Sequence, residues 1–154
     1  IIYGKNLFVF VADSIIYYSA DGITWTSSDN AVAGVKFDVD YGNGVFVSVG
    51  GTILTSSDGK SWSDTKPSSY TTQLQSVAYG NGTWVIVPTS GETVLTSIDG
   101  TTWTSISGFN AHIIEYINSY FLTIIGSGDL KYSLNGSSWE QLTITTGCCN
   151  DFTD

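Results

Sequence analysis

The sequence predicts an all-β protein, a β-propeller built from four-stranded antiparallel blades, with four blade repeats in its 154 residues. Three observations predict this fold class. Thr, Ser, Gly and aromatic residues are abundant while charged residues make up only 12%, a composition typical of short strands and tight turns. One short motif ending in tryptophan occurs four times. A tyrosine recurs about every 38 residues, close to the ~40 residues of a propeller blade.

The tryptophan motif reads Ser-x-Asp-Gly-x-Thr/Ser-Trp. It occupies residues 19–25, 56–62, 97–103 and 133–139, with asparagine in place of aspartate in the last copy. Asp-Gly and Asn-Gly pairs tolerate the positive φ angles of tight hairpins. We therefore expect each copy to form a hairpin between the third and fourth strands of a blade.

A second motif begins with the recurring tyrosine. It reads Tyr-Gly-Asn-Gly at residues 41–44 and 79–82, and in less regular form at residues 3–6 and 116–119. Alternating β-branched and aromatic residues follow it, as expected for strands. These runs cover residues 7–11, 45–49, 84–87 and 120–125. The second motif is therefore predicted to join the first and second strands.

Each repeat thus consists of strand A, a glycine-containing turn, strand B, a loop, strand C, the tryptophan-motif turn and strand D. In the third repeat, strand A is expected over residues 75–79 and strand C over residues 94–97. The repeat units cover approximately residues 1–34, 35–72, 73–110 and 111–149, and residues 150–154 begin or complete a further strand.

The spacing of the motifs predicts two different ends of the molecule. In a meander, the A–B and C–D turns lie at one end of the sheet, and the B–C and D–A loops lie at the other. The spacing within the tryptophan motif never changes, whereas the spacings across the B–C and D–A loops do. Binding residues usually lie on variable loops held by a rigid frame, so we expect recognition at the loop end.

The four tryptophan motifs resemble the Asp-box (BNR-like) repeats of β-propellers, in a variant shortened by one residue between Asp and Gly. In that family the carboxylate accepts hydrogen bonds from its own turn, and the tryptophan packs between neighbouring sheets. The resemblance implies a structural role for Asp21, Trp25, Asp58, Trp62, Asp99, Trp103, Asn135 and Trp139. It specifies no activity, because its members include sialidases, xyloglucan-cleaving hydrolases, sorting receptors, photosystem-assembly factors and viral or bacterial surface proteins.

Charge and composition exclude several classes of partner. The chain has a formal net charge of −9, with five lysines and no arginine. Nucleic-acid affinity comes largely from Lys and Arg, so neither nucleic acid nor an anionic membrane is an expected partner. No apolar run approaches the roughly 20 residues that span a bilayer, so no membrane insertion is expected. A sialidase, which holds its substrate carboxylate with an arginine cluster, is disfavoured as well.

A carbohydrate hydrolase that uses two carboxylates remains an alternative. Asp38 and Asp40 are expected to share one face of a strand A, and Glu115 lies in the comparable strand of the fourth repeat. The opposite face of the first of these strands is predicted to carry Val35, Phe37, Val39 and Tyr41. No spacing identifies an acid and its partner, so we expect these carboxylates to be solvated residues of the central channel.

The histidine and cysteine content predicts no metal site and no cofactor. His112 is the only histidine, which supports neither a His-rich metal site nor a Ser-His-Asp triad. Cys148 and Cys149 are adjacent. Neighbouring cysteines can form only a strained disulfide, so they are interpreted as free thiols or as partners for another chain.

A non-enzymatic recognition or adhesion propeller is therefore the expected function, with a glycan or a protein as ligand. The location expected for it is extracellular or on a virion surface. Aromatic and polar side chains in the variable loops provide the apolar platform and directional hydrogen bonds that such ligands need. The candidate ligand-binding residues are Asp13, Tyr70, Glu92, Phe109, Asn110, His112 and Asp129. A purely structural assembly module is the third alternative.

The two ends of the chain leave the number of blades open. Residues 150–154, written before residues 1–4, complete a strand A, so we expect the chain to be cut inside a strand. Four blades could close alone, two chains could associate into a larger ring, or the chain could belong to a longer propeller with further blades. The absence of methionine slightly favours the last account. An unpaired terminal blade exposes sheet faces and edges, which favours self-association.

Overall fold

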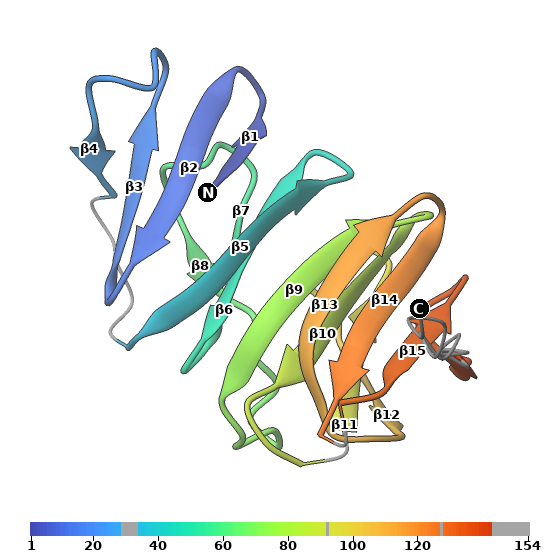
Figure 1. The fold of residues 1–154 in the computed structure, drawn as a ribbon. Coiled ribbons are helices and arrows are strands. Elements are labelled where there is room, and N and C mark those ends of the chain that lie inside the picture. The colour runs from blue at the N-terminus through green and yellow to red at the C-terminus, as the bar shows by residue number, and fades with distance from the viewer. Residues whose placement is uncertain (29–33, 92, 127, 143–154) are drawn as a thin grey trace, which may run out of the picture.

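The computed structural model describes residues 1–28, 34–91, 93–126 and 128–142. All regular elements in these ranges are β-strands, and they form four sheets of four strands each. Within every sheet, consecutive strands pair in antiparallel fashion. The sheets follow one another along the chain as successive blades (Figure 1). The predicted all-β propeller with four four-stranded blades is confirmed.

The blades are numbered here in chain order. Blade 1 consists of β1 (Ile2–Gly4), β2 (Leu7–Ala12), β3 (Ile15–Ser19) and β4 (Thr26–Ser27). Blade 2 consists of β5 (Lys36–Gly42), β6 (Val45–Gly50), β7 (Ile53–Ser56) and β8 (Ser63–Asp64). Blade 3 consists of β9 (Leu74–Gly80), β10 (Thr83–Pro88), β11 (Thr93–Ser97) and β12 (Thr104–Ser107). Blade 4 consists of β13 (Ala111–Ile117), β14 (Tyr120–Ile125), β15 (Leu130–Ser133) and β16 (Glu140–Leu142).

The A–B turns and the tryptophan-motif turns lie at the same end of the blades, which we call the turn end. The Lys5 ammonium in the A–B turn of blade 1 donates to the carbonyl of Ser57, which lies in the tryptophan-motif turn of blade 2, at 2.8 Å. The Asn81 amide of blade 3 donates in the same way to the carbonyl of Leu134 in blade 4, at 3.1 Å. The predicted arrangement of the two turns is therefore confirmed.

The B–C and D–A loops meet at the opposite end, which we call the loop end. The backbone N–H of Gly51, in a B–C loop, donates to the carbonyl of Val35 in the preceding D–A loop, at 3.0 Å. Gly126 donates likewise to Asn110, at 3.1 Å. Backbone hydrogen bonds thus fix each of these loop pairs against each other.

The hydrophobic core lies between the blades and forms three clusters, one at each junction. Each cluster packs a large aromatic residue of the later blade against aliphatic residues of the earlier one. The three aromatic residues, Phe46, Trp84 and Phe121, are completely buried. A buried ring of this size dominates the packing energy of its junction.

The tryptophan-motif turns share one hydrogen-bond pattern. In blade 3, the Asp99 carboxylate accepts from the N–H groups of Thr101 and Thr102 at 2.8 and 2.7 Å. The hydroxyl of Ser97 donates to Asp99 and accepts from the N–H of Gly100, both at 2.9 Å. Asn135 makes the same bonds in blade 4 with an amide oxygen. The motif therefore closes a hairpin with or without a charge.

A β-bulge changes the predicted faces of β5. Lys36 pairs with Gly50 and Asp38 pairs with Val49, so Phe37 is an extra residue without a partner on β6. The bulge reverses the alternation of side chains, because strand neighbours point to opposite faces. Lys36 is buried, with 4% of its surface exposed, whereas Phe37 is 42% exposed. The prediction that Val35 and Phe37 share a face with Val39 and Tyr41 is therefore wrong.

Candidate binding surface

The same bulge occurs in the first strands of blades 2, 3 and 4, which are β5, β9 and β13 and are called the inner strands below, at the loop end. In β9, Ser76 pairs with Val87 and Leu74 pairs with Pro88, so Gln75 is the extra residue. In β13 the register shifts between Ala111 and Ile113, so His112 is the extra residue. The extra residues are Phe37, Gln75 and His112, and all three are exposed. We call them the bulge residues. A bulge re-aims a side chain without changing the rest of the strand, which suits a binding surface.

The bulge residues differ in chemistry although their backbone position is the same. They supply an aromatic ring, an amide and an imidazole. At the turn end, by contrast, asparagine recurs in every A–B turn and Asp or Asn recurs in every tryptophan motif. Sequence reasoning selected His112 and missed Phe37 and Gln75. One signal could have found them: each lies four positions before the strand-A tyrosine and differs from repeat to repeat.

Three of the predicted ligand-binding residues come together at the loop end of blade 4. Asn110 and His112 both lie over Gly126, since a Cβ there would be 3.2 Å from Asn110 Nδ2 and 3.6 Å from His112 Nε2. The Asp129 carbonyl accepts from the N–H of Ile125, the residue before Gly126, at 2.9 Å. The side chains of all three are exposed. We call Asn110, His112 and Asp129 the blade 4 patch.

Phe109, the residue before Asn110, joins the blade 4 patch to the core. Its ring meets the Trp139 ring edge-on, with the centroids 5.1 Å apart. The Lys131 ammonium lies over the Phe109 ring, 5.2 Å from its centroid, a separation at which a cation is attracted to an aromatic face. Phe109 also packs against the core cluster between blades 3 and 4. Its observed contacts hold the loop in place.

The remaining predicted ligand-binding residues lie elsewhere. The Tyr70 hydroxyl donates to the carbonyl of Thr93 at 3.0 Å, and its ring packs on the core between blades 2 and 3. Burial raises the pKa of Tyr70 above its usual value. Asp13 lies in the β2–β3 turn with φ of 56°, and its carbonyl accepts from the N–H of Lys36 at 2.6 Å. Glu92, like Cys148 and Cys149, lies outside the described residues.

A cavity of about 280 Å³ lies along the inner strands and contains the three carboxylates considered for hydrolysis, Asp38, Asp40 and Glu115. Asp38 accepts from the N–H of Val39 at 2.8 Å through one oxygen, and from the N–H of Val77 at 3.0 Å through the other. A carboxylate engaged in this way joins the free edges of β5 and β9. It satisfies backbone groups that would otherwise lack partners.

Asp40 bridges the same two strands nearer the turn end. Its oxygens accept from the N–H groups of Tyr41 and Tyr79, both at 2.7 Å. Burial raises the pKa of Asp40, the two backbone bonds oppose that shift, and the charges of Asp38 and Glu115 add to it. The expectation that Asp38 and Asp40 are simply solvated is therefore corrected, because both are partly buried and bonded to the next blade.

In residues 1–28, 34–91, 93–126 and 128–142, no group of three His, Cys, Asp or Glu residues is placed to hold a metal ion. No helix within those same ranges is long and apolar enough to cross a membrane.

Solved structures with the same fold are β-propellers. A YCF48 protein bound to D1 peptide has a TM-score of 0.64 and 18% identity, over 92% of this chain and 51% of that one. A streptogramin B lyase has a TM-score of 0.76 and 8% identity, over 95% and 54% of the two chains. The GH74 enzyme of Niastella koreensis has a TM-score of 0.64 and 23% identity, over 90% and 23%.

These likenesses show the fold alone, because a propeller supports many unrelated activities. The chain spans about half the length of the YCF48 and streptogramin B lyase chains that it matches. Neither a protein-family model nor a curated protein matches the sequence.

Proposed function

We propose that this chain is a non-enzymatic recognition module that binds a protein ligand, through an exposed peptide segment, at the loop end of blades 3 and 4. The observation that carries the proposal is the set of bulge residues. Gln75 and His112 occupy equivalent backbone positions on neighbouring inner strands, yet they present different exposed side chains. The frame repeats while the presented chemistry does not, which is how rigid scaffolds support recognition.

The inner carboxylates support a binding function over a catalytic one. A two-carboxylate hydrolase needs one group free to protonate the leaving oxygen and another free to attack or to activate water. Both oxygens of Asp38 and of Asp40 are engaged: one accepts from an N–H of β5, and the other accepts from an N–H of β9. These two residues hold the blades together.

The choice of a protein ligand rests on two points. One propeller of the same fold was solved with a peptide bound. The net charge of −9 attracts a basic segment and raises its rate of association at low salt. The proposed ligand is therefore a basic peptide segment of a partner protein, and a glycan is the alternative that the experiment must separate.

The test is selection from a displayed random-peptide library, in parallel with a glycan array. We expect basic peptides to be enriched, and the double variant Gln75→Ala/His112→Ala to lose at least about tenfold in affinity, since a binding hot spot contributes over 1 kcal/mol. The matched control is Ile98→Ala, an exposed position at the turn end. Binding to sugars alone, or an equal loss in the control, would contradict the proposal.

A carbohydrate hydrolase is the second candidate, because the GH74 enzyme shares the fold and Glu115 is an exposed carboxylate in the inner cavity. The assay is release of reducing ends from a panel of polysaccharides by the unmodified chain and by Glu115→Gln. The recognition proposal expects no turnover from either. Turnover that disappears in the Glu115→Gln chain would establish the hydrolase instead.

A further inference from the structure

Each of the three junctions between blades buries the glycine of a tryptophan motif. That glycine lies against the first and third residues of strand B in the preceding blade. The glycines are Gly59, Gly100 and Gly136, and the residues that cover them are Leu7 with Val9, Val45 with Val47, and Thr83 with Val85. Gly22 of blade 1 is exposed, and the three atoms nearest to a Cβ there would all belong to Phe8 of its own blade. Among the described residues, no blade covers this junction face of blade 1.

This open face of blade 1 is aromatic. Phe10 stacks on Tyr17 with ring centroids 4.9 Å apart and meets Trp25 edge-on at 4.7 Å. None of these three rings belongs to the core clusters between blades. Ile23, two positions before Trp25 in the same motif, is 84% exposed. The equivalent positions in the other motifs are polar: Lys60, Thr101 and Ser137.

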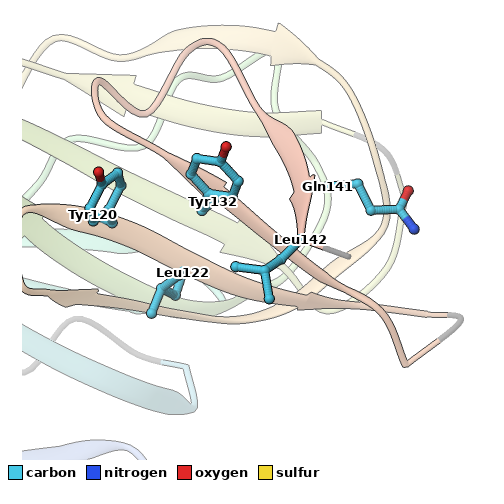
Figure 2. A pocket seen from close by; sticks show the side chains of 5 residues that line it. All are labelled: Tyr120, Leu122, Tyr132, Gln141 and Leu142. Carbon is cyan, nitrogen blue, oxygen red and sulfur yellow. The ribbon is translucent and has the colours of Figure 1, made fainter. Parts of the chain in front are cut away.

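Blade 4 carries the complementary open face. A groove of about 400 Å³ is lined by Tyr120, Leu122, Tyr132 and Leu142, with Gln141 at its rim. Figure 2 shows the first four side chains around the groove and Gln141 directed away from them. Tyr120 and Leu122 are the first and third residues of β14. They occupy the positions that cover the next glycine at the internal junctions.

We propose that these two faces are the two sides of a contact between copies of this chain, in which blade 4 of one copy packs on blade 1 of a second. End repeats that face water carry polar outer surfaces, whereas both of these faces are apolar and aromatic. Tyr120 and Leu122 then cover the second copy's Gly22. Tyr132 lies beside the second copy's Ile23, as Tyr18 lies beside Lys60, whose ammonium is 5.5 Å from the ring centroid.

The proposed contact differs from the internal junctions at one position, where blade 4 has Ile117 in place of a glycine. At those junctions a tyrosine ring lies over a glycine, and a Cβ on Gly4, Gly42 or Gly80 would overlap that ring. Blade 4 has Ile117 at the corresponding position, and it is 55% exposed, while Tyr3 is 53% exposed. The second copy's Tyr3 therefore packs beside Ile117, and the contact is wider at the turn end than an internal junction.

The contact is heterologous, because each copy has one face of each kind. Two copies that use all four faces form a closed pair, which avoids an open filament. A pair of copies fits the length of one solved propeller of the same fold. The streptogramin B lyase chain is matched over 54% of its length, so it holds about as many residues again. A second copy of this chain would supply a comparable number of residues.

Sedimentation equilibrium of the purified chain tests the proposal. The expected species has twice the monomer mass of 16.5 kDa. Each copy carries a formal net charge of −9, so two copies repel each other. The measurement is therefore made near 0.15 M salt, where a Debye length of about 8 Å screens this repulsion. Leu122→Lys and Phe10→Lys alter one face each, and each variant alone should be monomeric.

A mixture of Leu122→Lys with Phe10→Lys leaves one intact face on each chain and should restore a one-to-one pair. Ile98→Lys, at an exposed site outside both faces, should remain dimeric. Ile117→Gly should lower the dissociation constant by about threefold or more, because Tyr3 can then lie as Tyr41 lies on Gly4.

Two results would overturn the proposal. A dimer that persists in Phe10→Lys alone means that blade 4 faces pair with each other. A monomer at every concentration, with both faces binding an apolar dye, means that a further blade of a longer chain is the occupant.

Discussion

The turn end and the loop end consist of the same four blades but restrict their residues to different degrees. At the turn end, Gly42 and Gly80 lie beneath the tyrosine rings of the next blade, and the tryptophan motif repeats its hydrogen bonds in each blade. At the loop end, Phe37, Gln75 and His112 share a backbone position and nothing else. Identity among repeats thus marks positions where packing requires one residue. Difference among repeats marks positions free to serve recognition.

The largest expected difference between the two ends concerns an aromatic residue. Trp62 of the tryptophan motif is buried in the core between blades 1 and 2. Trp62→Ala should lower the free energy of unfolding by about 3–5 kcal/mol, because a large core side chain is removed and leaves a cavity. The matched change at the loop end is Phe37→Ala, which should cost under about 1 kcal/mol. Urea denaturation measures both, and equal losses would show that the ends are not distinct.

Glycine substitutions should have opposite signs at the two ends. A Cβ on Gly80 would overlap the Tyr116 ring close to its attachment point, which cannot move away cheaply. Gly80→Ala should therefore destabilise the chain by about 1–3 kcal/mol. Gly108, before the loop-end strand β13, has no atom within 4 Å of its would-be Cβ. Gly108→Ala should be neutral or stabilise by up to about 1 kcal/mol, because it restricts the unfolded chain. Thermal unfolding of both variants decides whether the signs differ.

Acid should weaken the turn end first. Hydrogen bonds from the N–H groups of Thr24 and Ile23 lower the pKa of Asp21 to about 2, and equivalent bonds lower the pKa of Asp58 and Asp99. A carboxylate with a lowered folded-state pKa stabilises the fold above its unfolded pKa of about 3.9, and this contribution is lost as the pH falls through the folded value. The free energy of unfolding should therefore drop between about pH 4 and pH 2.

Asn135 provides the internal control for this pH dependence, since it makes the same backbone bonds without a titrating group. Asp99→Asn should fold and should show a shallower loss of stability over that range. Asp40 acts in the opposite direction, because its pKa is raised by burial and its contribution is lost as the pH rises. Urea titrations from pH 2 to pH 6 measure the slope. An unchanged slope in Asp99→Asn would show that Asp99 does not contribute to the loss of stability in acid.

The sequence was sufficient for the blades and their turns because local rules specify them. Asn-Gly and Asp-Gly pairs require positive φ, and residues such as Asn43 and Gly44 adopt it. The bulges could not be predicted locally, because Val35, Phe37 and Val39 alternate as they would in a regular strand. The bridging of β9 by Asp38 depends on a residue of the next blade, 39 positions away. Contacts of that kind leave no mark on local spacing.

The smallest expected effect on stability belongs to the loop end and is the sharpest test of its role. Exchanging two bulge residues, Phe37→Gln with Gln75→Phe, keeps composition and net charge constant and leaves the backbone register as it is. Both positions are exposed, so the free energy of unfolding should change by less than about 0.5 kcal/mol. The peptides selected by the exchanged chain should nevertheless differ from those selected by the original, because the ring and the amide have moved between blades. An identical selection pattern would show that these positions do not contact the ligand, and a large loss of stability would show that the bulges, like the turns, are constrained by packing.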